Sequence, residues 1–349
     1  MLLDDDLPHS LNWADDAEAG ISRRPSGRGF VYRDAAGDPV SHAVRERIRA
    51  LAVPPAWTDV WICADPHGHL QATGRDARGR KQYRYHPDFR AHRDRAKFEH
   101  LVCFGEVLPA IRKCVADDLA RPGVTREKVV ASVVRLLEAT LVRVGNEEYA
   151  RANNSYGLTT LRDRHAQFTS RGLSLVFKGK HGIATRVEVQ DRRLRRVVKQ
   201  CQDLPGQFLF QYLTDGGTPT PVTSTDVNDY LRTVAAADVT AKDFRTWAGT
   251  LLAASTLADV TPPPTTTEAK HRIVEMLKAV SGELGNTPAV CRASYVHPAI
   301  VGWFTEGSLR ARWLGASTRG SRLLSGDERR LLRLLRVAAN AGSTRSLAA

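Results

Sequence analysis

The stretch VWICADPHGHLQATGRDARGRKQYRY, residues 60–85, decides the fold class of the first part of the chain. Runs of β-branched, aromatic and apolar residues lie at 60–64, 69–73 and 81–85, and Asp, Pro and Gly residues that favour turns separate them. This pattern predicts an antiparallel meander. Upstream, 29–33 reads as a further strand and Ser41 as the N-cap of a short helix. We therefore expect a small antiparallel, β-rich domain over residues 28–95.

The segments on either side of this domain lack a clear period. Residues 1–27 are polar and end in a basic run, which favours a flexible basic N-terminal segment. Residues 86–95 are charged and are expected to form an unstructured linker or hinge. Both expectations depend on the absence of an apolar pattern.

Beyond residue 96 the period becomes mainly helical. Apolar residues recur at helical spacing over 97–118, and Thr125 is placed to cap a second helix whose apolar stripe runs from Val130 to Val144. A β-hairpin is predicted at 173–189, and further helices are expected from Ala241, Thr265 and Ser325. The fold class is therefore α+β, with a larger, mainly α-helical domain at 96–349.

Composition favours a polyanionic partner. The 51 Lys and Arg exceed the 38 Asp and Glu, so the chain carries a net charge of +13, and the excess is spread along most of its length. Nucleic acid is a better candidate for this partner than a membrane surface. No window approaches the length of an apolar span, so a membrane-spanning protein is not expected. Five widely spaced cysteines and an acidic start predict a reduced, cytoplasmic protein. Binding to DNA would make it nucleoid-associated. His67-Gly68-His69 reads as part of a turn, and no metal site is expected.

The last hairpin of the meander concentrates groups that suit DNA. Cationic side chains alternate there with tyrosines and an amide, a mixture that can contact phosphates and base edges. The candidate DNA-binding residues are Arg80, Lys81, Gln82, Tyr83 and Tyr85. The alternative is an edge strand that its charges keep soluble.

Single residues of the helical part have plain explanations when each is taken alone. Tyr295 lies in a short helical segment, where a tyrosine is usually a packing residue. Arg143, between two valines, can extend to solvent, and Lys180, between glycines of a tight turn, can be simple surface charge. Lys242 and Arg245 share one helix face. Their order along the chain and their neighbouring residues, however, indicate that they belong to one active site.

Arg143-Val-Gly, Phe177-Lys-Gly-Lys180, Lys242-Asp-Phe-Arg245 and Gly285-Asn-Thr-Pro followed by Ser294-Tyr295 closely resemble the active-site boxes of the poxvirus-like (bacterial) type IB DNA topoisomerases. The resemblance covers roughly residues 28–310 and includes the strand at 79–85. It implies a catalytic domain of the tyrosine recombinase and type IB topoisomerase kind, which forms a clamp around DNA together with the β-rich domain. A monomer is the expected state.

The resemblance also implies a set of roles. Tyr295 attacks a DNA phosphodiester to give a 3′-phosphotyrosyl intermediate, Arg143 and Arg245 bind the phosphate oxygens, and Lys180 protonates the leaving 5′-oxygen with help from Lys242. Asn286 stands where many relatives have histidine, so it can donate a hydrogen bond but cannot carry a proton.

The bond is exchanged and not hydrolysed, so strand swivelling and religation would need neither ATP nor another cofactor. Two alternatives remain at this point. A site-specific tyrosine recombinase or integrase uses the same chemistry, but typically has histidine at the place of Lys242 and a helical N-terminal domain. A non-catalytic DNA-binding protein is the other alternative, and the intact set of six residues speaks against it.

Overall fold

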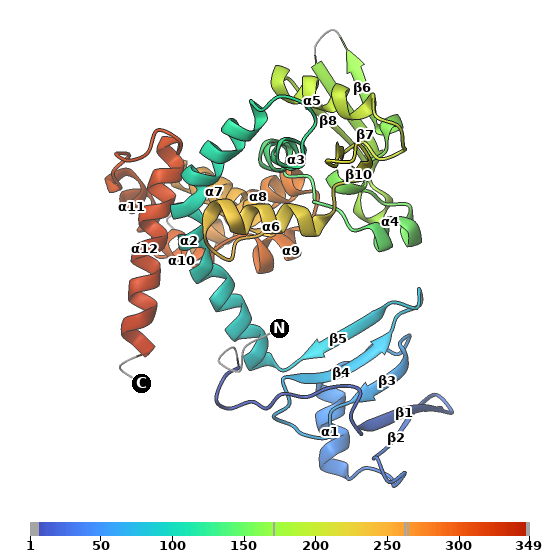
Figure 1. The fold of residues 1–349 in the computed structure, drawn as a ribbon. Coiled ribbons are helices and arrows are strands. Elements are labelled where there is room, and N and C mark those ends of the chain that lie inside the picture. Colours follow the sequence, from blue (N-terminus) through green and yellow to red (C-terminus); the bar gives the residue numbers. More distant parts are fainter. Residues whose placement is uncertain (1–6, 170–171, 262, 264, 347–349) are drawn as a thin grey trace. The chain divides into compact units, whose positions relative to one another are not determined.

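The computed structural model describes residues 7–169, 172–261, 263 and 265–346. The chain divides into two compact units, Met1–Lys97 and Phe98–Ala349. The first holds an antiparallel five-stranded sheet and the second is mostly helical, so the predicted α+β class is confirmed (Figure 1).

The first unit is built on its sheet. The strand order is β2-β1-β3-β4-β5, where the strands are β1 (Ile21–Ser26), β2 (Gly29–Arg33), β3 (Thr58–Ile62), β4 (Leu70–Arg75) and β5 (Lys81–Tyr85). Helix α1 (His42–Ala50) is capped by Ser41, whose hydroxyl accepts a hydrogen bond from the Val44 N–H at 3.3 Å. Ile48 of α1 packs with Ile62 and Ala72 of the sheet to form a small separate core.

Strand β1 lies inside the segment that was expected to be flexible. It pairs with both β2 and β3, and Ile21 at its start is buried. The arginines of β1 interrupt the apolar pattern by which a strand is recognised in a sequence. Arg23 is nevertheless ordered: its Nη2 donates to the Trp57 carbonyl at 2.5 Å, and its guanidinium lies 4.2 Å from the centre of the Phe30 ring. Backbone pairing supplies the order that apolar periodicity does not reveal.

The predicted linker at 86–95 is wrong as well, because helix α2 (Pro87–Leu119) begins there. Pro87 occupies the first turn, where a missing N–H costs nothing, and the His86 Nδ1 accepts a hydrogen bond from the Asp88 N–H at 3.2 Å. Phe89 is buried against the rings of His69 and Tyr85. The buried ring of Phe89 therefore stabilises the first turn of α2, whose charged sequence does not predict a helix.

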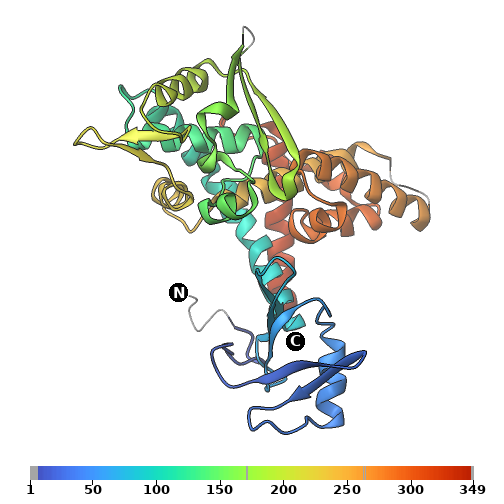
Figure 2. The ribbon, with the colours of Figure 1, turned by 90° about the vertical axis from the view of Figure 1, so that its right-hand side faces the viewer.

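The central helix of the second unit is α3 (Arg126–Thr140), whose Val130, Val133 and Leu137 are fully buried. Figures 1 and 2 show the elements around it, including the long green strands of the three-stranded sheet. The strands of this unit are β6 (Ala166–Thr169), β7 (Gly172–Lys178), β8 (Ala184–Val189), β9 (Gln211–Leu213) and β10 (Pro219–Pro221). The other helices are α4 (Glu147–Asn153), α5 (Arg192–Gln202), α6 (Ser224–Ala235), α7 (Ala241–Asp259), α8 (Thr266–Leu284), α9 (Pro288–Ser294), α10 (Pro298–Thr305), α11 (Leu309–Gly315) and α12 (Gly326–Ser346).

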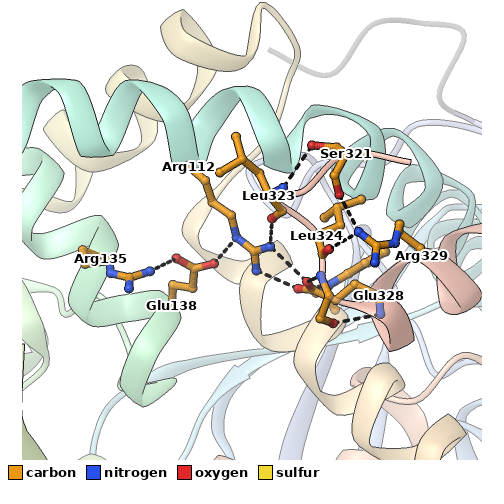
Figure 3. Close-up of polar contacts among 10 residues, drawn as sticks. Arg112, Arg135, Glu138, Ser321, Leu323, Leu324, Glu328 and Arg329 are labelled. Atoms are coloured by element: carbon orange, nitrogen blue, oxygen red, sulfur yellow. Dashed lines mark hydrogen bonds and ion pairs between the residues drawn. The ribbon is translucent and has the colours of Figure 1, made fainter. Parts of the chain in front are cut away.

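The final helix, α12, is tied to α2 by a buried ion-pair network (Figure 3). Arg112 of α2 donates to Glu328 of α12 and to Glu138 of α3, each at 2.6 Å, and also to the Leu323 carbonyl. The predicted cap at Ser325 is confirmed, since its hydroxyl accepts from the Glu328 N–H and its own N–H donates to the Glu328 carboxylate. Within the part of the chain that the structure describes, no helix is long and apolar enough to cross a membrane.

Candidate active site

Arg245 is the most deeply buried of the candidate residues. It lies in the second turn of α7, only 4% exposed, and donates to the Leu284 carbonyl at 2.6 Å and to the Leu141 carbonyl. Its Nε has no hydrogen-bond partner among the described residues. A buried, always-charged guanidinium with a spare donor is suited to bind an anion.

Leu141 explains how a carbonyl comes to face Arg245. Helix α3 ends at Thr140, earlier than the predicted apolar stripe, and Leu141 takes the left-handed conformation with φ of 54°. Non-glycine residues adopt this conformation at a cost and often do so at functional sites. The reversal of the chain at Leu141 starts the irregular segment that carries Arg143.

Arg143 lies in that segment and not in the helix. Its carbonyl accepts a hydrogen bond from the Leu158 N–H at 2.9 Å, and Gly157 packs so closely that a Cβ there would come within 2.6 Å of the same carbonyl oxygen. The Arg143 Nη2 donates to Asn286 Oδ1 at 2.5 Å and to the Gly285 carbonyl at 3.3 Å. Burial and the charge of Arg245 lower the pKa of Arg143, which still carries its charge at neutral pH.

Asn286 joins the two arginine-bearing regions. Gly285 ends α8 in the left-handed conformation, which a glycine adopts without cost, and the Asn286 N–H donates back to the Ser281 carbonyl at 3.1 Å. The Asn286 Oδ1 is occupied by Arg143, while its half-buried Nδ2 has no hydrogen-bond partner among the described residues. The amide therefore presents a donor beside the two guanidiniums.

Tyr295 is half-buried at the junction between α9 and α10, with the Arg245 guanidinium 5.2 Å from the centre of its ring. Burial raises the pKa of its hydroxyl, but the charge and the hydrogen-bonding approach of Arg245, with smaller contributions from Arg143 and Asn286, outweigh burial. The pKa of Tyr295 consequently lies below its ordinary value. A phenol whose pKa is lowered in this way is a better nucleophile precursor near neutral pH.

The two candidate lysines differ in placement. Lys180 is exposed at the tip of the β7–β8 hairpin and lines a cavity of about 640 Å³ together with Arg143 and Arg245. Lys242 is exposed one turn before Arg245 and does not line that cavity. The structure thus brings Arg143, Arg245, Asn286 and Tyr295 together. Of the six candidates, Arg143, Arg245 and Lys180 line the cavity, and Asn286, Tyr295 and Lys242 do not.

Pattern reading of the sequence overlooked two residues of α7. Gly249 and Thr250 contact the backbone of Tyr295, although neither belongs to a recognised box. A glycine inside a helical pattern was the available signal, since it often marks a close approach of another segment.

The candidate DNA-binding residues lie in the first unit, four of them on β5 and Arg80 directly before it. Tyr83 and Tyr85 are exposed and stacked, with ring centres 6.0 Å apart. The polar members already have acidic partners: Asp76 accepts from Arg80 at 2.8 Å and from Gln82 at 3.0 Å, and Lys81 lies 2.6 Å from Asp16. A phosphate that binds these cations must therefore exchange with a carboxylate.

Comparison with known proteins assigns both units to one kind of enzyme. Residues 86–305 match the family described as eukaryotic DNA topoisomerase I, catalytic core, and residues 29–76 match the bacterial DNA topoisomerase IB, N-terminal domain. DNA topoisomerase 1B of Acanthamoeba polyphaga mimivirus is 33% identical over 285 residues, which are 79% of this chain and 85% of the viral protein. DNA topoisomerase 1 of Rabbit fibroma virus (strain Kasza) is 22% identical over 304 residues, 80% of this chain and 91% of that protein. DNA topoisomerase 1B of Vaccinia virus (strain Copenhagen) is 22% identical over 278 residues, 76% and 83% of the two chains.

Proposed function

Because this chain belongs to the type IB DNA topoisomerases, we propose that it relaxes supercoiled duplex DNA with Tyr295 as the nucleophile. The observation that carries the assignment is the surroundings of the Tyr295 hydroxyl, whose pKa is lowered by two arginines and an amide. A packing role does not require a tyrosine to lie beside the buried Arg245 and the half-buried Arg143.

In the proposed cleavage step the Tyr295 oxygen attacks the phosphorus and the bond from phosphorus to the 5′-oxygen breaks. The phenolic proton leaves to solvent, the 5′-oxygen gains a proton, and the products are a 3′-phosphotyrosyl link and a free 5′-hydroxyl. Religation is the reverse reaction, in which the 5′-hydroxyl attacks the phosphotyrosine. The energy of the phosphodiester is kept in the covalent link, so the cycle needs no ATP.

Arg143, Arg245 and Asn286 are the proposed stabilisers of the transition state. Negative charge grows on the non-bridging oxygens as the phosphorus becomes five-coordinate, and fixed donors that already point into the site stabilise it without reorganisation. The Arg245 Nε and the Asn286 Nδ2 are the unpaired buried donors of this set. We propose that the two guanidiniums take the place that a divalent metal has in other phosphoryl-transfer enzymes, and that no cofactor takes part.

Lys180 is the proposed general acid and Lys242 its assistant. The hairpin tip between Gly179 and Gly182 lets Lys180 approach DNA, and the ammonium group can protonate the 5′-oxygen as it departs. Lys242 would act through its charge, because it lies one helical turn from Arg245. Both assignments depend on a lysine reaching the leaving oxygen once DNA is bound.

Both units are proposed to contact the duplex. The second supplies the chemistry, and the first adds contacts through Arg80 and through Lys81, Gln82, Tyr83 and Tyr85 of β5. While the 3′ end stays attached to Tyr295, the free 5′ end swivels about the intact strand until superhelical stress is relieved. A monomer suffices, since each step uses residues of one chain.

The test is to trap the covalent adduct. Wild-type protein incubated with supercoiled plasmid without ATP should relax it, and a denaturant quench should leave protein on the 3′ end of the nick. Tyr295→Phe should bind DNA and form no adduct, whereas Tyr212→Phe on β9 should behave as wild type. An adduct formed by Tyr295→Phe, or one attached to a 5′ end, would overturn the assignment.

A further inference from the structure

Tyr295 lies at a break between two short helices. It follows α9 with φ of −132° and ψ of −7°, and both its own N–H and that of Val296 donate to the Cys291 carbonyl. Helix α10 begins at Pro298 with His297 as its N-cap. Such a break leaves backbone groups without helical partners, so the conformation of the tyrosine is not set by its own segment alone.

A single hydroxyl of α7 serves both sides of this break. Thr250 is fully buried, its Oγ1 donates to the Tyr295 carbonyl at 3.1 Å, and the same oxygen accepts from the His297 N–H at 3.2 Å. The hydroxyl therefore holds the chain on both sides of Val296. Valine at position 250 would have nearly the same shape and could make neither bond.

Gly249, the preceding residue, allows the two segments to come this close. A Cβ at position 249 would lie 2.8 Å from the Tyr295 carbonyl oxygen and 3.1 Å from the Tyr295 Cβ. Glycine weakens the interior of a helix, so its presence in the middle of α7 indicates that the approach matters more than helix propensity.

The same helix carries Arg245. Residues 245 and 249 are four apart and share one face of α7, and Thr250 follows directly. The arginine that approaches the Tyr295 hydroxyl and the two residues that hold the Tyr295 backbone are thus fixed on one rigid element. Their relative positions do not depend on the loops on either side of α9.

We infer that Gly249 and Thr250 are positioning residues, which set the phenolic oxygen of Tyr295 relative to Arg245 for attack on the phosphorus. The inference rests on the proposed role of Tyr295 as nucleophile. A merely structural Thr250 would satisfy the same backbone groups and affect folding stability alone, so the two roles differ in what a substitution does to chemistry.

The experiment compares three variants in single-turnover cleavage at saturating protein. Thr250→Val should lower the cleavage rate constant by roughly 30- to 100-fold, the loss typical of a misplaced reacting group, and leave noncovalent DNA binding within about twofold. Thr250→Ser, which keeps the hydroxyl, should restore most of the rate.

Thr246→Val is the matched control. Thr246 is also buried on α7, one turn earlier, but among the described residues its hydroxyl bonds only to the Lys242 carbonyl of its own helix. It should lose stability as Thr250→Val does and retain its cleavage rate. Thermal unfolding of each variant separates the two effects, and Thr250→Ala against Thr250→Ser gives the same comparison if the valine variant does not fold.

Each outcome decides something. Wild-type cleavage by Thr250→Val, or an equal loss in Thr246→Val, would overturn the inference while a Tyr295→Phe protein without adduct still supports the nucleophile. An adduct in Tyr295→Phe would instead remove the nucleophile assignment and the positioning role together.

Discussion

The oxygen and the nitrogen of the Asn286 amide have different surroundings, and this difference determines how we expect a substitution to change the cleavage rate. Its oxygen accepts a hydrogen bond from Arg143, while its nitrogen is a buried donor without a hydrogen-bond partner among the described residues. Asn286→Asp keeps the size and the acceptor but removes the donor and adds a negative charge near the phosphate. We expect cleavage to slow by roughly 100-fold, as when one donor of an oxyanion site is lost.

The control for this substitution is Asn228→Asp, the same change on α6 in the same unit. Asn228 Oδ1 accepts from the Ala241 N–H, and an aspartate can accept that bond equally well. Single-turnover cleavage should be unchanged in this variant. Near-normal cleavage by Asn286→Asp would mean that the position only holds Arg143.

Lys180 makes a prediction that depends on the leaving group. Lys180→Ala should cleave an ordinary duplex slowly, because the departing 5′-oxygen then lacks a proton donor. A duplex with sulfur at the 5′-bridging position should restore the rate, since a thiolate departs without a proton. Lys178→Ala, at an exposed position of the same hairpin, should leave the ratio of the two rates unchanged.

If Lys180→Ala is impaired equally on oxygen and sulfur substrates, Lys180 is not the acid. The same pair of substrates, tested with Lys242→Ala, measures how much Lys242 contributes to protonation of the departing 5′-oxygen. Because Lys242 is proposed only to assist Lys180, we expect a smaller ratio there than for Lys180→Ala.

At the scale of the element, α12 is joined to α2 by one buried and one exposed ion pair. Glu328 binds Arg112 with side chains that are 8% and 21% exposed, whereas Glu106 binds Arg336 with both near half exposure. Glu328→Ala leaves Arg112 buried with only part of its partners and should lower the free energy of unfolding by about 3 kcal/mol. Glu106→Ala should cost below about 1 kcal/mol. Equal losses in urea denaturation would contradict this ranking.

The contribution of Glu328 should also depend on pH. Burial raises the pKa of Glu328. Hydrogen bonds from Arg112 and from the Ser325 N–H, together with the charge of Arg112, lower it by more than burial raises it, so the folded pKa lies below the ordinary value. Its stabilisation is therefore present above the unfolded carboxyl pKa of about 4.3 and is lost as the pH falls through the lower folded value. The stability gap between wild type and Glu328→Gln should be constant near neutral pH and shrink in acid.

One ion pair between the N-terminal segment and β5 leads us to expect a substitution that strengthens DNA binding. Asp16 accepts from Thr73 of β4 at 2.8 Å and pairs with Lys81, a proposed DNA contact. Asp16→Asn should release Lys81 and strengthen DNA binding about two- to fivefold at low salt, the equivalent of one surface ion pair. Glu18→Gln removes the same charge from the same segment, where Glu18 forms no ion pair with any residue that the structure describes, and this variant should bind as wild type.

If Asp16→Asn weakens DNA binding instead, Asp16 orients Lys81 towards DNA and does not compete with it. Either result concerns the segment that residue patterns alone left without a role.

Elements with a strong local signal were predictable, and the others were not. The β7–β8 hairpin and the caps at Thr125 and Ser325 follow from turn and capping chemistry, which acts within a few residues. Strand β1 and the start of α2 depend on partners far along the chain, such as Trp61 for Ser22 and His69 for Phe89. Charged sequences hide such elements because tertiary pairing, and not periodicity, makes them form.

The same distinction applies to the candidate site. The order of Arg143, Arg245, Asn286 and Tyr295 could be recognised from the sequence, but each side chain is held by groups from elsewhere in the chain. Leu141 and Leu284 supply carbonyls to Arg245, and Thr250 supplies a hydroxyl to the tyrosine backbone. No spacing rule connects these residues, so only the folded chain reveals them.

For the whole molecule, the decisive property is the net charge of +13 and how it meets DNA. Phosphate contacts release counterions, so affinity should fall steeply between low and moderate salt, with a slope that loses roughly 0.9 for each contact removed. If β5 contacts the backbone, replacing both Arg80 and Lys81 by Gln should reduce the slope by about 1–2 and weaken binding at every sequence. Lys113→Gln, an exposed α2 position paired with Asp117, should leave the slope unchanged.

Because these two cations are already paired, they contribute to the slope only if they exchange partners when DNA binds. Arg80 and Lys81 each lie 2.6 Å from a carboxylate, so they bind DNA only by exchanging Asp76 or Asp16 for a phosphate. Phosphates along DNA offer a far higher density of negative charge than one carboxylate, which makes the exchange favourable at low salt and weaker as salt screens it. An unchanged slope in the double variant would show that the two acids keep their partners in the complex. The contribution of β5 would then rest on its exposed tyrosines, which contact DNA without releasing counterions.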